Sequence, residues 1–175
     1  MGSPAETGSR LRRVVSNTGP LLHLSEAQAL PLLMQTGEVY IPRAVDGEME
    51  QRDSLWHNAR PSWIHAETLI APYDGEATAW QQAGLLDAGE AEAIALARQV
   101  QADWFLTDDG AARLFAQALG LEVHGSLAIV LWAAAVGHLN RAVAEAALNR
   151  LAQSSLWVSA NVLAEARSAL DQLLS

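Results

Sequence analysis

Side chains that carry oxygen ligands recur at four separated places in this chain and could hold a metal ion between them. They are Asn17, Glu48, Glu90 with Glu92, and Asp108 with Asp109. Carboxylates held close together repel one another strongly unless a divalent cation lies among them. Hard oxygen ligands, with few nitrogens and no sulfur, favour Mg²⁺ or Mn²⁺ over zinc. The residue types therefore predict a magnesium or manganese site, provided that the fold brings the four places together.

Two short strands are expected to place the first and the last of these groups. Residues 14–16 form a buried run that ends at Asn17 and passes through Gly-Pro into an apolar helix. Residues 103–106 form a second apolar strand, and residues 107–110 follow at its carboxyl end. Carboxyl ends of neighbouring parallel strands lie side by side, and ligands gather there. We therefore expect the scattered acids to converge in one pocket at this edge of a sheet.

Strands alternate with helices along the rest of the chain. Further short strands are predicted at residues 38–41, 63–65 and 122–124. Helices are predicted at residues 21–33 in one or two pieces, and then at 43–52, 53–59, 73–83, 88–101, 111–119, 126–136, 141–152 and 160–173. This alternation indicates an α/β fold with a parallel sheet covered on both faces. We expect a flexible lead over residues 1–11 and a single domain over 12–175, closed by a C-terminal helical extension.

Three of the candidate ligands also have a purely structural interpretation. Asn17 could serve only as a helix cap, a position that favours asparagine. Glu48 could belong to a solvated, acidic helix face. Asp109 could cap the helix that begins just after it. Both interpretations stay open for these residues.

The two glutamates at the start of the alanine-rich helix compete for one role. Glu90 follows Asp87 by three positions, the acidic form of a capping box, and that role explains Glu90 completely. Glu92 lies about 200° further around the helix, so the two cannot both face one metal. This favours Glu92 as the ligand. Asp108 and Asp109 are adjacent, so strand alternation sends their side chains in different directions.

The composition disfavours several other classes of protein. All 11 basic residues are arginine, and without lysine a P-loop, a receiver domain or a haloacid-dehalogenase-like phosphatase is a poor candidate. Cysteine is absent and the five histidines lack metal-ligand spacing, which disfavours a zinc site. No Gly-x-Gly-x-x-Gly motif follows the first strand, and Ser16 does not lie in a nucleophile elbow. With a net charge of −9, any nucleic acid would be held by local arginines and bound cations.

No segment predicts a membrane helix. The longest apolar run, residues 127–136, is too short to span a bilayer. The chain also does not open on a charged and then apolar leader. We expect a cytoplasmic protein with no membrane association.

Four ordered blocks of the sequence resemble the PIN-domain family, in particular its VapC-like and DUF3368-type branch. They are Val-Val-Ser-Asn-Thr-Gly-Pro-Leu from residue 14, Val-Tyr-Ile-Pro-Arg-Ala-Val-Asp-Gly-Glu-Met from residue 39, Gly-Glu-Ala-Glu-Ala-Ile-Ala-Leu-Ala from residue 89, and Phe-Leu-Thr-Asp-Asp from residue 105. The resemblance covers about residues 14–136. It implies a three-layer α/β/α sandwich around a parallel sheet, with an acidic site for Mg²⁺ or Mn²⁺. It also implies endoribonuclease activity, usually as the toxin of a toxin–antitoxin pair.

The resemblance assigns the metal site to particular positions. The family's acids fall on Asn17, Glu48, Glu92 and Asp109, with Asp108 beside the last. Glu48, Glu92 and Asp109 are the expected catalytic groups. Asn17 departs from the acidic pattern, because an amide oxygen can bind a metal but carries no charge. We therefore expect weaker metal binding and reduced activity.

The surroundings of the site are assigned in the same way. Ser16 and Thr107 occupy positions where small hydroxyl residues often support the family's site. Arg43 and Arg113 flank the acidic blocks and are our candidates for contacts to substrate phosphates, the alternative being solvated surface arginines.

The leading hypothesis is a metal-dependent ribonuclease with an RNA substrate and, as a toxin, an antitoxin partner. A second hypothesis is an attenuated PIN-fold module that binds nucleic acid or protein without catalysis, which Asn17 and the net acidity favour. A third and weaker one is a phosphatase or nucleotide hydrolase that uses the same acids. The acidic surface together with Trp132 and Trp157 also predicts a homodimer or capture of a basic peptide.

Overall fold

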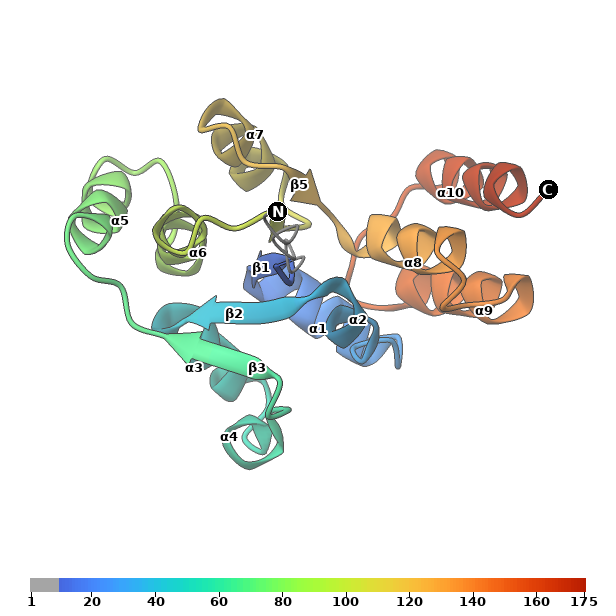
Figure 1. Ribbon diagram of the computed structural model, residues 1–175, viewed down its shortest axis with the longest axis horizontal. Helices are drawn as coiled ribbons and strands as arrows, with labels where there is room; N and C mark the ends of the chain where they lie inside the picture. Colours follow the sequence, from blue (N-terminus) through green and yellow to red (C-terminus); the bar gives the residue numbers. More distant parts are fainter. Residues whose placement is uncertain (1–9) are drawn as a thin grey trace, which may run out of the picture.

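A computed structural model describes residues 10–175, and its centre is an all-parallel five-stranded sheet (Figure 1). The strands are β1 (Arg13–Ser16), β2 (Glu38–Pro42), β3 (Ile64–Glu67), β4 (Trp104–Leu106) and β5 (Val123–His124), in the spatial order β3-β2-β1-β4-β5. Central strand β1 pairs with β2 on one side and β4 on the other, and Val15 lies opposite Tyr40 and Phe105. Val14 and Val15 have no exposed surface, as expected of a strand covered on both faces.

Helices cover both faces of this sheet and give the predicted α/β/α sandwich. They are α1 (Thr18–Glu26), α2 (Leu32–Thr36), α3 (Arg43–Arg52), α4 (Trp56–Ala59), α5 (Tyr73–Gln82), α6 (Ala88–Gln99), α7 (Gly110–Ala118), α8 (Ser126–Ala135), α9 (Arg141–Gln153) and α10 (Ala160–Leu173). The connections from β1 to β2 and from β2 to β3 run toward one edge of the sheet. The connection from β3 to β4, which carries α5 and α6, and the connection from β4 to β5 run toward the other edge. Right-handed crossovers therefore place α1 and α2 opposite α5, α6 and α7, as Figure 1 shows.

Helix α6 lies directly on the sheet, against β1, β2 and β4. Its alanines make this possible: Ala91, Ala93, Ala95 and Ala97 have no exposed surface. Small side chains let the helix backbone approach the strands closely, as the alanine-rich sequence predicted. The start of α6 is thereby fixed relative to the carboxyl ends of the central strands.

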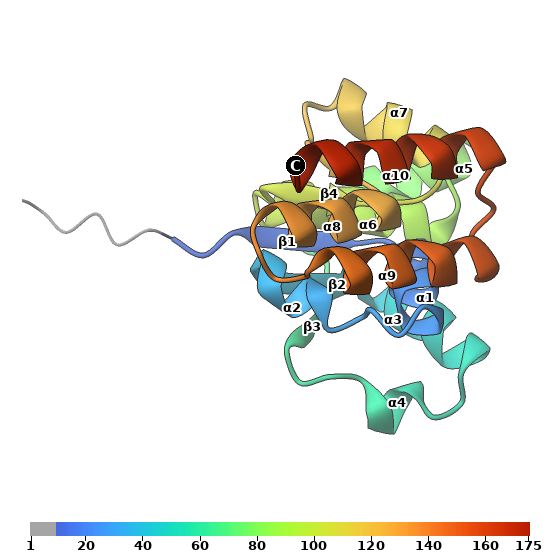
Figure 2. The same cartoon turned by 90° about the vertical axis from the view of Figure 1, so that its right-hand side faces the viewer.

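Helices α8, α9 and α10 pack on one another, and α8 and α9 also contact α1 (Figure 2). Leu148, Leu151 and Leu170 are fully buried in this part and belong to the same continuous core as Val14 and Val15. Among residues 10–175, no helix combines the length and the apolar character that crossing a bilayer requires.

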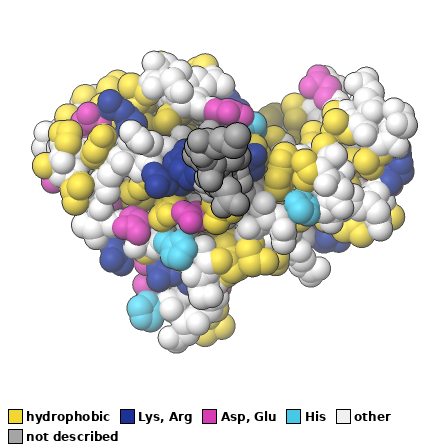
Figure 3. All heavy atoms as spheres, in the orientation of Figure 1, with side chains coloured by type: hydrophobic (Ala, Val, Ile, Leu, Met, Phe, Trp, Pro, Cys, Tyr) yellow, Lys and Arg dark blue, Asp and Glu magenta, His cyan; other side chains and the backbone are white. Residues whose placement is uncertain are grey.

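The N-terminal segment joins the sheet at the edge where the strands begin. Most of the lead predicted for residues 1–11 lies outside the described residues. At its end, the Arg10 guanidinium donates from Nη2 to Asp103 Oδ1 at 3.0 Å. The face shown in Figure 3 carries arginine side chains as well as acidic ones. The Arg12 guanidinium stacks over Trp104, 3.8 Å from the ring centroid.

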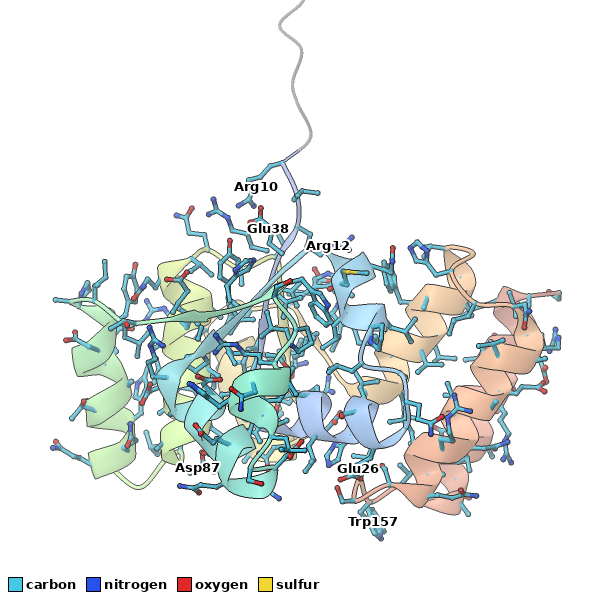
Figure 4. The ribbon with its side chains drawn as sticks, turned by 90° about the horizontal axis from the view of Figure 1, so that it is seen from below. Arg10, Arg12, Glu26, Glu38, Asp87 and Trp157 are labelled. Atoms are coloured by element: carbon cyan, nitrogen blue, oxygen red, sulfur yellow. The ribbon has the colours of Figure 1, made fainter. Side chains whose placement is uncertain are left out.

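The opposite edge, where the strands end, carries the crevice that the strand order predicts. Successive connections run toward one edge of the sheet from β1 to β3 and toward the other edge from β3 to β5, so the switch point lies between β1 and β4. Ligands of open α/β sheets bind outside the carboxyl ends of the strands at such a point. In Figure 4 the strands begin near Arg10 and Arg12 at the top. Asp87 and Trp157 lie at the opposite, lower edge.

Candidate functional site

A cleft of about 520 Å³ opens at the carboxyl ends of β1 and β4. Four elements far apart in sequence supply its acidic and amide lining, which consists of Asn17, Glu48, Asp87, Glu90, Asp108 and Asp109. The convergence expected of the scattered oxygen ligands is therefore present for most of them.

Asn17 joins the end of β1 to the start of α1. Its Oδ1 accepts from the Thr18 N–H at 2.9 Å, so Asn17 is the N-cap of α1. Its Nδ2 donates to Thr107 Oγ1 at 3.4 Å, and the same hydroxyl oxygen accepts from the Asp109 N–H at 3.1 Å. The buried Thr107 hydroxyl thus links Asn17 to Asp109. Ser16, also fully buried, donates its hydroxyl to the Asn17 carbonyl at 2.9 Å.

Glu48 reaches the cleft from α3. Thr18 Oγ1 donates to Glu48 Oε2, so a contact across the cleft fixes the carboxylate. The carboxylate also lies against Gly89 in the first turn of α6, where a Cβ would be only 2.5 Å from Glu48 Oε1. Glu48 is half-buried and therefore does not belong to a solvated helix face.

Glu90 combines a structural position with a place in the cleft. It forms the predicted capping box: Asp87 Oδ1 accepts from the Glu90 N–H at 2.8 Å, and Glu90 Oε2 accepts from the Asp87 N–H at 3.1 Å. Burial raises the pKa of Glu90, the bond from Asp87 opposes this, and the charges of Asp87, Asp109 and Glu48 raise it further. Glu90 therefore caps α6 and also lines the cleft with Glu48 and Asp109.

Glu92 lies outside this cleft. Its Oε1 accepts from the Ala44 N–H at 3.3 Å, and it lines a separate hollow with Arg43 and Thr68. The reason is the angular separation on α6: with Glu90 toward the cleft, Glu92 points away. Arg43 lies in the same separate hollow and donates to Thr68 Oγ1 at 3.4 Å. Neither Glu92 nor Arg43, both predicted from the sequence, lines the acidic cleft.

Asp109 and Asp108 diverge, as adjacent residues after a strand should. Asp109 faces the cleft and caps α7, its Oδ1 accepting from the Ala112 N–H at 2.8 Å. Asp108 has a side chain only 9% exposed, and its oxygens accept from His23 Nδ1 at 2.7 Å and from the Ser126 N–H and hydroxyl at 2.7 and 2.6 Å. Burial raises the pKa of Asp108, but these bonds from His23 and Ser126 outweigh it and hold the pKa below its ordinary value. Asp108 is thus a structural anion.

One arginine at the acidic cleft is not among those that the sequence suggested. Arg113 lines the neighbouring groove and directs its guanidinium at the Thr107 and Val123 carbonyls, both at 3.5 Å. Arg52 lines the acidic cleft itself. It follows Glu48 by four positions on α3, a spacing that places two side chains on one helix face and could have identified it.

A family model for PIN domains, DUF3368, matches residues 13–172. The chain belongs to the PIN-domain family. The match confirms the resemblance drawn from the four sequence blocks and extends past residue 136 to include α9 and most of α10. No curated protein matched the chain.

PIN domains generally use divalent metal ions, and the donor set of this PIN domain fits one chemically. Glu48, Glu90 and Asp109 each accept a protein hydrogen bond on one carboxylate oxygen. Within residues 10–175, no donor bonds the second oxygen of any of the three. A cation would also offset the repulsion that raises the pKa of Glu90. No three acidic or histidine side chains of this range already surround one point, so binding requires side-chain rotation.

Proposed function

We propose that this PIN domain is a divalent-cation-dependent ribonuclease whose metal ligands are Glu48, Glu90, Asp109 and the amide oxygen of Asn17. The observation that carries the proposal is the convergence of these groups from four elements in one cleft, each carboxylate with one oxygen unbonded in the described structure. Glu90 replaces Glu92 as the third ligand, because Glu92 lines a different hollow. Mg²⁺ or Mn²⁺ bound there would activate a water and orient it toward a phosphodiester.

The chain's own groups position the reacting parts. The Thr107 hydroxyl oxygen accepts from both Asn17 Nδ2 and the Asp109 N–H, which fixes these two residues relative to each other. Arg52 supplies a local positive charge at the cleft, which a protein with a net charge of −9 needs to hold a substrate phosphate. In this proposal Arg52 takes the role that the sequence suggested for Arg43 and Arg113. Asn17 leaves the site one negative charge short of four acids, so we expect modest metal affinity.

The test is cleavage of RNA by the purified protein in Mg²⁺ or Mn²⁺. We expect cleavage that chelation with EDTA abolishes and that Asp109→Asn also abolishes. Asparagine caps helices as well as aspartate does, so α7 should remain intact in that variant. Asp74→Asn, at an exposed position on α5, is the matched control and should cleave like the wild type. Full activity in Asp109→Asn would reject the site.

A second function is a PIN-fold module that binds nucleic acid or a protein without catalysis. The uncharged Asn17 and the need for side-chain rotation favour it. Calorimetry with Mn²⁺ separates the two functions: saturable binding supports the nuclease, and no binding at millimolar Mn²⁺ supports the module.

The biological setting is also part of the proposal. A ribonuclease of this family would serve as the toxin of a toxin–antitoxin pair, with an antitoxin as its protein partner. A small reading frame directly beside the gene would support this assignment. We further propose a homodimer, which light scattering would reject if only monomer were found.

A further inference from the structure

Trp157 differs from the other tryptophans in its exposure. Trp157 is 86% exposed, whereas Trp56 and Trp104 are buried and Trp63, Trp80 and Trp132 are partly buried. Large aromatic side chains of a folded domain are usually covered, and tryptophan is enriched at contact surfaces, so its surroundings decide what an exposed one can bind. In Figure 4 Trp157 projects beyond the ribbon at the edge where the strands end.

The loop that carries Trp157 is held firmly in place. The Ser155 N–H and hydroxyl donate to the two carboxylate oxygens of Glu26 at 2.6 and 2.8 Å. Burial raises the pKa of Glu26, but these bonds, together with the charges of His23 and Arg52, outweigh it and lower the pKa below its ordinary value. Beyond the loop, Ser159 caps α10 by accepting from the Val162 N–H at 3.1 Å. The exposed ring is thus presented by a fixed loop, which lowers the entropic cost of binding a ligand.

Trp157 stands at the junction of two cavities of opposite character. It lines the acidic cleft, and it also lines a groove of about 500 Å³ between α8 and α10. Leu131 and Val162 contribute apolar surface to that groove. Leu156 and Asp108 also line both cavities, so the cleft and the groove adjoin. A ligand that spans the junction would place a charged, cation-binding part in the cleft and a flat, apolar part on the tryptophan.

We infer that Trp157 is a stacking platform for an unpaired nucleobase of an RNA whose phosphate lies in the acidic cleft. A nucleotide has both parts that the junction selects, an anionic phosphate and a planar base. Base stacking on aromatic side chains is sequence-tolerant and requires a base that is not already stacked in a duplex. Trp157 therefore gives the enzyme a preference for single-stranded over double-stranded RNA. This inference rests on the proposed ribonuclease function for the identity of its ligand.

The test is binding of an unstructured, mixed-sequence oligoribonucleotide of about ten nucleotides, a length within the range of site sizes found for OB folds that bind single strands. Fluorescence anisotropy is measured in Ca²⁺, which takes the same hard oxygen ligands as Mg²⁺. We expect Trp157→Ala to weaken binding by about tenfold and Trp157→Phe to retain most of it. Affinity for the same strand annealed to its complement should not change. Leu55→Ala is the matched control, because Leu55 is 67% exposed and lines neither the acidic cleft nor the groove.

The outcomes separate this inference from the nuclease proposal, because cleavage is assayed separately in Mn²⁺. If the wild type does not cleave RNA but Trp157→Ala binds unpaired RNA more weakly than the wild type does, the stacking platform is supported and the nuclease proposal is rejected. If the wild type cleaves but Trp157→Ala binds unpaired RNA as tightly as the wild type, the platform is overturned. Conversion of a dimer to a monomer by Trp157→Ala, with RNA affinity unchanged, would also overturn it and assign Trp157 to contact with a second copy.

Discussion

Gly89 in the first turn of α6 leaves the space that the carboxylate of Glu48 occupies. A Cβ at residue 89 would lie 2.5 Å from Glu48 Oε1 and 2.7 Å from Oε2, well inside van der Waals contact. The absence of a side chain at this position is thus what lets α3 and α6 bring Glu48 and Glu90 to one cleft.

Gly89→Ala should therefore disturb the site more than the fold. The flexible Glu48 side chain can swing away from the new methyl group, so we expect little loss of stability but about a tenfold loss of Mn²⁺ affinity by calorimetry. Gly47→Ala is the matched control, since nothing lies within 4 Å of a Cβ there. It should stabilise α3 by about 0.5–1 kcal/mol and leave metal affinity unchanged. Wild-type Mn²⁺ affinity in Gly89→Ala would show that Glu48 is not a ligand.

Asn17→Asp should strengthen the site by restoring a fourth negative charge. Aspartate caps helices as well as asparagine does, so α1 should be preserved. We expect Mn²⁺ affinity and the rate of RNA cleavage each to rise by about tenfold, corresponding to about 1.4 kcal/mol of added interaction. Asn140→Asp makes the same change at the N-cap of α9, far from the cleft, and should alter neither quantity. Equal behaviour of the two variants would indicate that residue 17 does not contact the metal.

Asp108→Asn should destabilise the protein in a pH-dependent way. The buried carboxylate accepts three hydrogen bonds from His23 and Ser126, and weakening them should cost about 2 kcal/mol of unfolding free energy at pH 7. Because the folded pKa is lowered from 3.8, the stabilisation is complete above that pH and is lost as pH falls toward the folded value. Denaturant unfolding of both proteins from pH 7 to pH 3 measures the difference. A difference that does not shrink below about pH 3.8 would contradict the assignment.

A control for Asp108→Asn is Asp171→Asn. Asp171 is 68% exposed and pairs with Arg141 at the surface. Solvent-exposed ion pairs contribute little, so this variant should unfold almost like the wild type at every pH. A comparable loss of stability in both variants would mean that removal of negative charge in general, rather than the buried network, is responsible.

The fold could be predicted from the sequence because the local signals agree with one another. Asp87 with Glu90 marks the start of α6, Asn17 the start of α1, and the β-branched run before Asn17 the central strand. The alanines of α6 also predicted its close approach to the sheet. Strand alternation with helices then left a parallel sheet as the consistent arrangement.

The site was less predictable, because a side chain's direction depends on how each helix is rotated against the sheet. The capping role of Glu90 is visible in the sequence, but the sequence does not show that this role also turns the Glu90 side chain toward the cleft. A capping residue lies at a helix start, and the start of α6 lies at the carboxyl edge of the sheet, so Glu90 faces the cleft. The divergence of Asp108 and Asp109 was predicted, whereas the burial of Asp108 against His23 depends on contacts between distant segments.

The most direct measurement compares Mn²⁺-dependent RNA cleavage by Glu90→Gln and Glu92→Gln. Glutamine keeps both local structures, since it completes a capping box at residue 90 and can still accept from the Ala44 N–H at residue 92. We predict that Glu90→Gln loses at least about tenfold in cleavage rate and in Mn²⁺ affinity, while Glu92→Gln matches the wild type. Loss of cleavage in Glu92→Gln with full activity in Glu90→Gln would contradict the proposed site.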